Sequence, residues 1–256
     1  MSFADIPYHN FTTIICVSCQ ESFAVPLPCG NRFCTVCNFK RLSLIRHRIK
    51  YCIDNNPFLQ YYEYKLLTLT VRSQKNLPDM IRFLQKSFRR LRQTKEWGEL
   101  VAGGAFVIEV KKNSWGFHAH IHAIIYSRWF SIKKLQSLWF KASCGSRGVD
   151  IRKIPQGSIL YYLTKYITKP GENVVESDLD DVNFALKGTR LFQPFGNWHG
   201  LSKGYKKPVC HCKSCDSTGS FEIECLLWGR GNLREKKYFV EGMGWIHTSL
   251  IPDHLL

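Results

Sequence analysis

"GAFVIEVKKNSWGFHAHIHAIIY", residues 104–126, contains two apolar runs joined by a short polar turn. The second run places His118, His120 and His122 at every second position. Alternate residues of a strand point to one face of a sheet, so we expect the three imidazoles on one face and apolar side chains on the other. The stretch predicts a β-hairpin. The fold that it favours is of the α+β class, with a central antiparallel sheet and helices packed on it.

The first run of this hairpin carries a single carboxylate, Glu109, between Ile108 and Val110. An ionised carboxylate among apolar neighbours is costly unless it is paired or binds a metal ion. If the two strands pair so that Glu109 lies opposite His120, the carboxylate shares the histidine face, and a slip of one residue moves it to the other face. Imidazole and carboxylate groups are common metal ligands, so the hairpin is a candidate metal site. A water-exposed sheet face with an edge-strand glutamate is the simpler alternative.

Other segments predict the remaining elements of the sheet and its helices. The pattern favours strands at residues 64–71 and 148–154 and helices at 76–97, 130–142 and 157–170. The acidic stretch at 171–183 is expected to be a mobile excursion. We divide the chain into a zinc-binding N-terminal module with a basic helix (1–55), a catalytic domain (56–172) and a C-terminal extension with a second cysteine cluster (173–256).

Composition narrows the class of partner. The chain has 256 residues, 45% of them hydrophobic, which is enough for a folded core. Lys and Arg number 36 against 20 Asp and Glu, and the resulting net charge of +16 favours a polyanion, first of all nucleic acid. No apolar run approaches the roughly 18 residues of a spanning helix, and the N-terminus lacks the pattern of a secretory signal. We therefore expect a cytoplasmic protein with no membrane partner.

The helix expected at 157–170 carries a polar arc. At 100° per residue, Tyr162, Lys165, Tyr166 and Lys169 fall within about 100° of one another. A tyrosine is a competent nucleophile toward phosphorus when a metal polarises the phosphate and cations stabilise the developing charge. The alternative is an amphipathic helix whose tyrosines are half packed on the sheet.

Together these motifs resemble the HUH endonuclease superfamily, which includes the rolling-circle replication initiators of plasmids and phages. "KLLTLT" (65–70) is similar to the first motif of the superfamily, His120-Ile121-His122 to its histidine-hydrophobe-histidine motif, and "YYLTKYITK" (161–169) to its tyrosine motif in the two-tyrosine form. The cysteine-rich "CGNRFCTVCNFKR" (29–41) also resembles a segment that precedes the catalytic domain in some plasmid initiators. The resemblance covers about residues 65–170 and implies a palm-like sheet.

The resemblance also implies a reaction and a set of partners. Mg²⁺ or Mn²⁺ would bind His120, His122 and Glu109, and a tyrosine would attack origin DNA in single-stranded or hairpin form. Attack leaves a 5′-phosphotyrosine and a free 3′-OH. A host polymerase would extend this 3′-OH with the help of a host helicase. The protein would then be located at the nucleoid or plasmid. Tyr166 is the first choice of nucleophile, because Tyr162 stands where one-tyrosine relatives carry a glutamate. Tyr162 would serve in a second cleavage and joining, with Lys165 and Lys169 nearby, and His118 has no assigned role.

Eleven cysteines predict structural zinc sites rather than disulfides in a chain without a secretion signal. The strongest spacing is that of two Cys-x-x-Cys pairs, Cys16, Cys19, Cys34 and Cys37. A possible second zinc site comprises Cys210, Cys212, Cys215 and Cys225. Cys29 could replace a ligand of the first site and His211 could compete at the second. Cys52 and Cys144 are expected to be core thiols.

Other classes of protein remain open at this point. The run from His118 to Ile124 also fits the pattern of histidine triad nucleotide hydrolases, in which a histidine is the nucleophile and no catalytic metal is required. A two-tyrosine HUH transposase is a closer variant. A zinc-bearing DNA-binding regulator without catalysis would leave the histidine row unexplained. Removal of divalent metal should abolish cleavage by an HUH enzyme and spare a triad hydrolase.

Overall fold

The computed structural model describes residues 11–73, 76–167, 171–206, 212, 214–217, 221–227 and 233–240. The chain forms two compact units, one of Asn38–Tyr205 and one of Met1–Cys37 with Lys206–Leu256. These units replace the three consecutive segments that we expected. The basic helix and residues 173–205 belong to the same unit as the hairpin, because both contribute side chains to its core. Among the described residues, no helix combines the length and apolar character needed to cross a membrane.

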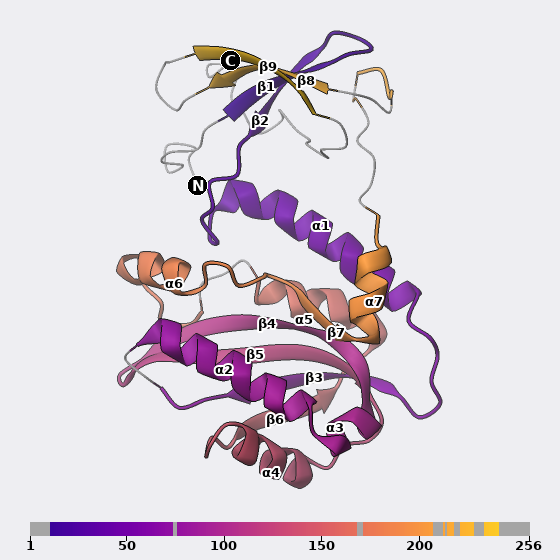
Figure 1. The fold of residues 1–256 in the computed structure, drawn as a ribbon, viewed down its shortest axis with the longest axis vertical. Helices are drawn as coiled ribbons and strands as arrows, with labels where there is room; N and C mark the ends of the chain where they lie inside the picture. The colour runs from indigo at the N-terminus through magenta and orange to yellow at the C-terminus, as the bar shows by residue number, and fades with distance from the viewer. Residues whose placement is uncertain are drawn as a thin grey trace. The chain divides into compact units, whose positions relative to one another are not determined.

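The larger unit is built on a five-stranded antiparallel sheet of order β6-β3-β5-β4-β7 (Figure 1). Its strands are β3 (Glu63–Thr70), β4 (Val101–Asn113), β5 (Gly116–Ser127), β6 (Gly148–Lys153) and β7 (Gln193–Gly196). Its α-helices are α1 (Thr35–Asp54), α2 (Leu77–Arg92), α3 (Lys95–Leu100), α4 (Ile132–Ala142), α5 (Ile159–Lys165), α6 (Leu179–Ala185) and α7 (Asn197–Gly204). Most of α1 belongs to this unit, and its first residues precede the boundary. The α+β class with a central antiparallel sheet is therefore confirmed.

The register of the central hairpin is the one that the buried carboxylate requires. Glu109 on β4 lies opposite His120 on β5. On the other side of β5, Thr70 of β3 lies opposite His120 and Thr68 lies opposite His122. Residues opposed in an antiparallel pair share a face. The central strand thus brings its histidines between a carboxylate on one neighbour and hydroxyls on the other.

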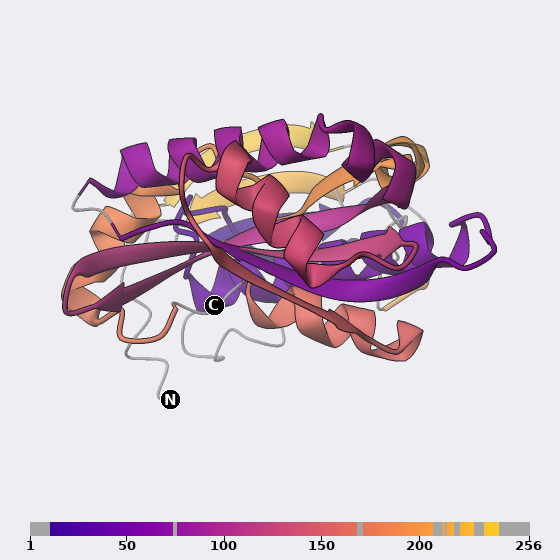
Figure 2. The same ribbon diagram turned by 90° about the horizontal axis from the view of Figure 1, so that it is seen from below.

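Helices cover both faces of the sheet (Figures 1 and 2). On the histidine face, a buried cluster joins Ile124 of β5 to Ile49 of α1, Leu163 of α5 and Trp198 of α7. On the opposite face α2 and α4 pack together, and the ring of Phe88 on α2 lies 4.9 Å from that of Phe106 on β4. The histidine face is therefore apolar at one end of the sheet and polar at the other.

The helix expected at residues 76–97 is two helices, α2 and α3, with a break at Gln93 and Thr94. The Thr94 side chain accepts a hydrogen bond from the backbone N–H of Trp97, which is how an N-cap residue starts a new helix. The apolar side of α2 is buried at Ile81, Leu84, Phe88 and Leu91.

Two expectations for the region after β6 were wrong. The tyrosine helix ends at Lys165, with Tyr166 as its C-cap, instead of continuing to residue 170. The backbone N–H of Ile167 donates to the carbonyl of Thr164, so the last turn tightens instead of continuing as α-helix. The acidic stretch is ordered as a short 3₁₀ turn (Glu176–Asp178) and α6, because Val182 is buried and Asp178 is ion-paired with Lys112.

Gly104 offers a test of the hairpin register. Its φ is +154°, and a Cβ built on it would lie 1.9 Å from the carbonyl oxygen of Ile124 on the paired strand. Gly104→Ala should destabilise the unit by roughly 3 kcal/mol through backbone strain and overpacking. Gly98 in α3 has open space around its Cβ, so Gly98→Ala is a control that should leave stability unchanged or slightly raised. Chemical denaturation measures both, and equal midpoints for the two variants would refute the register.

The smaller unit contains a four-stranded antiparallel sheet of order β2-β1-β8-β9. Its strands are β1 (Phe11–Cys16), β2 (Ser22–Pro26), β8 (Phe221–Leu227) and β9 (Leu233–Val240). Pairing of β1 with β8 brings an N-terminal and a C-terminal segment next to each other in one sheet. This long-range pairing makes the two terminal segments one unit.

Candidate metal and nucleophile site

The two central histidines are oriented by threonines on the neighbouring strand. Thr68 Oγ1 lies 3.2 Å from His122 Nδ1, and Thr70 Oγ1 lies 3.0 Å from His120 Nδ1. Both contacts follow from the register of β3 with β5, which places each threonine opposite its histidine. A hydrogen bond at one ring nitrogen fixes the orientation of the imidazole and leaves the other nitrogen for a ligand. In both rings that nitrogen is Nε2.

The two imidazoles and the β4 carboxylate form a buried polar cluster of side chains on one face of the sheet, the histidine pocket. His122 Nε2 is 2.8 Å from Glu109 Oε2, and the side chains of the two residues are only 7% and 11% exposed. His120 Nε2 is buried and has no hydrogen-bond partner among the described residues. Lys111 Nζ lies 3.9 Å from Glu109 Oε2 and 3.3 Å from Glu172 Oε2. One buried nitrogen is therefore left without a partner beside the hydrogen-bonded pair of His122 and Glu109.

The pKa values of Glu109 and His120 favour the binding of a cation at this site. Burial alone would raise the pKa of the Glu109 carboxyl, but the hydrogen bond to His122 and the nearby charges of His122 and Lys111 hold the pKa below its usual value. Burial, with smaller contributions from His118 and His122, lowers the pKa of His120 to about 3. At neutral pH the pocket thus offers a carboxylate and an uncharged His120 imidazole.

This donor set suits a divalent cation. A buried Nε2 without a partner is costly in an empty protein interior, and a metal ion would satisfy it. Two imidazole nitrogens with one carboxylate form a set that divalent transition metals such as Mn²⁺ accept. Glu109 lies opposite His120 in the register and is hydrogen-bonded to His122, and these three residues stay the predicted ligands of such an ion.

Of the two tyrosines, Tyr166 lies directly against this pocket. Its ring stacks on the imidazole of His122, with the ring centroids 3.7 Å apart and the planes inclined by 6°. Lys165 Nζ lies 5.6 Å from the centroid of the same tyrosine ring. Tyr162 packs against the apolar cluster beneath α5, and its ring contacts that of Tyr161 at 5.5 Å. Lys169 lies outside the described residues.

Two side chains near the site lie outside the pair of Glu109 with His122. Tyr161 on α5 is 62% exposed. His118 is half-buried, with its ring 4.4 Å from that of His120, next to the pocket but away from Glu109, which lies opposite His120. His118 therefore supports its neighbour and has no direct place in the pair with the carboxylate.

The structure does not group the cysteines as we expected. Within the part of the chain that the structure describes, two clusters have all their sulfur atoms within 4.8 Å of one another, one of Cys16, Cys19, Cys212 and Cys215 and the other of Cys29, Cys34 and Cys37. Either cluster could hold a structural zinc ion. The first cluster combines cysteines from both expected sites because β1 pairs with β8, and in the second Cys29 joins Cys34 and Cys37.

The remaining cysteine positions have mixed outcomes. Cys210, His211 and the side chain of Cys225 lie outside the described part of the chain. Cys52 is buried, as expected of a core thiol. Cys144 is exposed, which corrects that expectation, because it lies in the turn after α4 with a positive φ of 50°.

Sequence reasoning missed the residues that support the pocket. Thr68 and Thr70 were part of a recognised motif but had no assigned task, although their alternation along a strand next to alternating histidines was the available signal. Lys111 and Glu172 were also missed. Glu172 carries no local signal, because its contact with Lys111 depends on the path of the chain after α5.

The fold and site define a basic α+β protein whose antiparallel sheet carries a His-Glu pocket beside a tyrosine. Residues 22–214, well over half of the chain, match the family model described as replication protein, Rep_1, and the chain belongs to this family. This membership supports a replication initiator that binds origin DNA and agrees with the expected rolling-circle type. The comparisons with curated proteins and with solved structures found no match.

Proposed function

We propose that the protein initiates rolling-circle replication by nicking and rejoining single-stranded origin DNA through a 5′-phosphotyrosine intermediate. The observation that carries this proposal is the stacking of Tyr166 on His122, the histidine paired with Glu109. That contact unites the two halves of the inferred chemistry, a nucleophile and a cation pocket, on one face of the sheet. A pocket without the tyrosine would suit many metal-dependent reactions.

The roles of the residues follow from their chemistry. A divalent ion such as Mg²⁺ or Mn²⁺, bound by His120, His122 and Glu109, would supply Lewis-acid polarisation of the scissile phosphate. Thr68 and Thr70 orient the two imidazoles, and the exposed Lys165 stabilises negative charge on the phosphoryl oxygens.

Covalent transfer proceeds at Tyr166 Oη. The phenolic oxygen loses its proton to solvent and forms a bond to phosphorus while the bond from phosphorus to the 3′ oxygen breaks. The electron pair leaves with that oxygen, which takes up a proton and becomes a free 3′-OH. A host polymerase would extend this 3′-OH, and a host helicase would open the duplex ahead of it. Tyr162, one helical turn earlier, is the proposed second nucleophile for rejoining.

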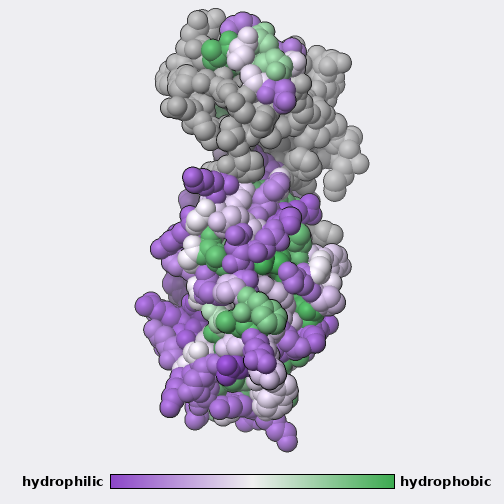
Figure 3. Space-filling model, turned by 90° about the vertical axis from the view of Figure 1, so that its right-hand side faces the viewer, coloured by the Kyte–Doolittle hydropathy of each residue, from purple (hydrophilic) through white to green (hydrophobic). Residues whose placement is uncertain are grey.

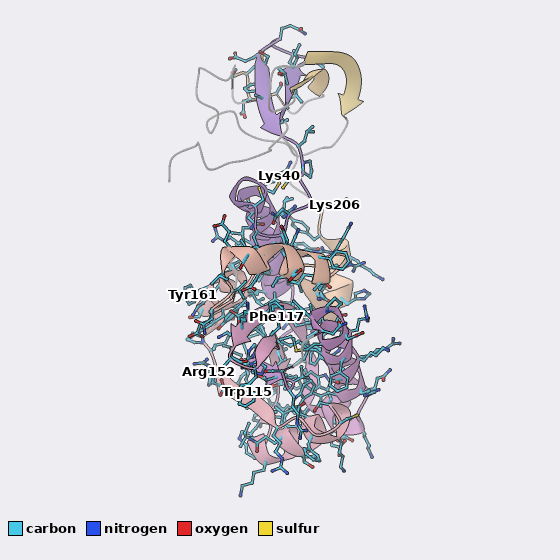
Figure 4. All side chains as sticks on the ribbon, turned by 90° about the vertical axis from the view of Figure 1, so that its left-hand side faces the viewer. Lys40, Trp115, Phe117, Arg152, Tyr161 and Lys206 are labelled. Carbon is cyan, nitrogen blue, oxygen red and sulfur yellow. The ribbon has the colours of Figure 1, made fainter. Side chains whose placement is uncertain are left out.

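The surface of the larger unit is compatible with a single-stranded polyanion. Trp115, in the turn between β4 and β5, is 82% exposed, and Tyr161 on α5 is 62% exposed (Figure 4). Exposed aromatic rings provide stacking platforms for unpaired bases, and the net charge of +16 attracts the phosphates. The face of this unit drawn in Figure 3 is mostly hydrophilic, with apolar groups in separate patches.

A covalent adduct tests the proposal directly. The full chain is incubated with single-stranded oligonucleotides from its own replicon and Mn²⁺, then separated under denaturing conditions. We expect a protein band shifted by the mass of the fragment downstream of the nick, which is linked through its 5′ phosphate, and EDTA should abolish this shift. Cleavage that persists in EDTA would instead indicate a histidine triad hydrolase. Metal-dependent cleavage without an adduct would contradict the proposal that a tyrosine is the nucleophile.

A further inference from the structure

We propose that Cys16, Cys19, Cys212 and Cys215 bind one zinc ion that joins an N-terminal and a C-terminal segment into a single module. Their four sulfur atoms all lie within 4.8 Å of one another. The site lies in the unit of Met1–Cys37 with Lys206–Leu256, so it is separate from the histidine pocket in the other unit and does not rest on the proposed function.

The sulfur separations are those of a metal site and not of disulfides. Cys16 Sγ lies 3.8 Å from Cys215 Sγ, and Cys19 Sγ lies 3.5 Å from Cys212 Sγ. Tetrahedral zinc with Zn–S bonds of about 2.3 Å requires sulfur atoms about 3.8 Å apart. A disulfide bond is only about 2.05 Å long. The cysteines therefore already surround a space of the size that the metal requires.

The two Cys-x-x-Cys segments fold into the same turn. In the first, the N–H of Cys16 donates to the carbonyl of Glu21 and that of Gln20 to the carbonyl of Cys16. In the second, the N–H of Cys212 donates to the carbonyl of Ser217 and that of Asp216 to the carbonyl of Cys212, at identical spacings.

Both turns also place a non-glycine residue in the left-handed region directly after the second cysteine. The φ angles are 61° at Gln20 and 53° at Asp216. A side chain rarely adopts this conformation without a local reason, and two equivalent occurrences in one cluster point to a shared requirement. In each turn the first cysteine is buried and the second is exposed. The turns thus present their four sulfurs as two matching pairs, which is what tetrahedral coordination by two loops requires.

The sheet explains why these distant segments meet. The first turn connects β1 to β2, and the second precedes β8, whose residue Phe221 lies opposite Cys16 in the pairing with β1. Ser217 adds a contact between the turns, since its Oγ lies 3.0 Å from Cys215 Sγ and 3.6 Å from Cys16 Sγ. A small sheet buries little apolar surface, so a structural metal supplies much of its stability.

Metal content in cysteine variants of the full chain tests whether this is one shared site. Cys16→Ser with Cys19→Ser should remove one zinc equivalent, and Cys212→Ser with Cys215→Ser should remove the same one. The fourfold variant should therefore lose no more than either pair. Cys34→Ser with Cys37→Ser should keep this equivalent, and Cys144→Ser, at an exposed cysteine outside both clusters, is the control for substitution itself.

Cobalt substitution of the unaltered protein gives a second measurement that does not depend on variants that fold poorly. Co²⁺ in this site should show the visible absorption of tetrahedral coordination by four sulfurs, and the spectrum should persist in the Cys34→Ser, Cys37→Ser variant. Loss of the same zinc equivalent in the Cys34→Ser, Cys37→Ser variant would overturn the proposed ligand set. The ligand set would also be overturned if the Cys16, Cys19 pair and the Cys212, Cys215 pair each removed a different zinc equivalent. Bound iron in place of zinc would overturn the assignment of the metal. The adduct assay reports separately on the histidine pocket.

Discussion

Tyr166→Phe should eliminate the covalent adduct with origin DNA and lower the rate of the first cleavage by about 10³-fold or more, the scale seen when a nucleophile is removed. The substitution removes only the phenolic oxygen. The remaining ring can still stack on His122, so the pocket and α5 should keep their structure. Denaturing electrophoresis of the adduct, with single-turnover kinetics of cleavage, measures the effect.

Two matched variants separate a nucleophile from a merely aromatic residue. Tyr161→Phe changes an exposed phenol on the same helix and should leave cleavage unchanged. Tyr162→Phe should leave the first adduct intact and reduce the yield of rejoined strands. If Tyr166→Phe retained the adduct while Tyr162→Phe lost it, the assignment of the initiating nucleophile would be reversed. An adduct that survives both substitutions together would contradict the tyrosine mechanism.

The hairpin could be predicted from sequence because one buried charge determines which face of β4 lies with the histidines. Glu109 has no low-energy place on the apolar face, so the strands must pair with it beside the histidines, and the observed pairing opposite His120 confirms this. The supporting threonines were harder to assign. Their role depends on which strand pairs with β5 on its other side, and the alternation of threonines in β3 does not by itself decide that choice.

The end of the tyrosine helix was predicted wrongly for a different reason. Helical periodicity continues through Tyr166, but the helix stops one residue earlier, where the backbone tightens around Thr164. Tyr166, whose ring stacks on His122, is the C-cap residue of α5, with φ −95° and ψ −1°. Periodicity alone cannot detect such an end, because the side chains that pack against the sheet decide it.

The cysteine clusters show the limit of local spacing. Two Cys-x-x-Cys pairs close in sequence suggested a single site, yet Cys16 and Cys19 meet Cys212 and Cys215 instead. The partner is determined by the pairing of β1 with β8, which joins residues about 200 positions apart in the chain. Each pair was recognisable as a metal-binding turn, whereas the choice of partner depends on the topology of the sheet.

Glu109→Gln should reduce Mn²⁺ affinity and, at a fixed limiting Mn²⁺ concentration, slow cleavage by about 10²-fold or more. The amide keeps the size of the side chain and can still accept a hydrogen bond from His122 Nε2, so the β4–β5 pairing should survive. What is lost is the negative charge that attracts the cation. Direct titration of Mn²⁺ measures the loss independently of activity, and high Mn²⁺ should restore part of the cleavage rate.

Glu172→Gln provides the matched control for this substitution. Glu172 also contacts Lys111, at 3.3 Å, but it is 72% exposed and lies outside the pair of Glu109 with His122. Its neutralisation changes the net charge by the same amount and disturbs the same lysine, so it should leave Mn²⁺ affinity nearly unchanged. Equal losses in the two variants would mean that the general field of the surface, and not a ligand on β4, governs metal binding. A loss confined to Glu109→Gln is expected because only this carboxylate is held against the imidazoles, in a pocket where burial strengthens its interaction with a cation.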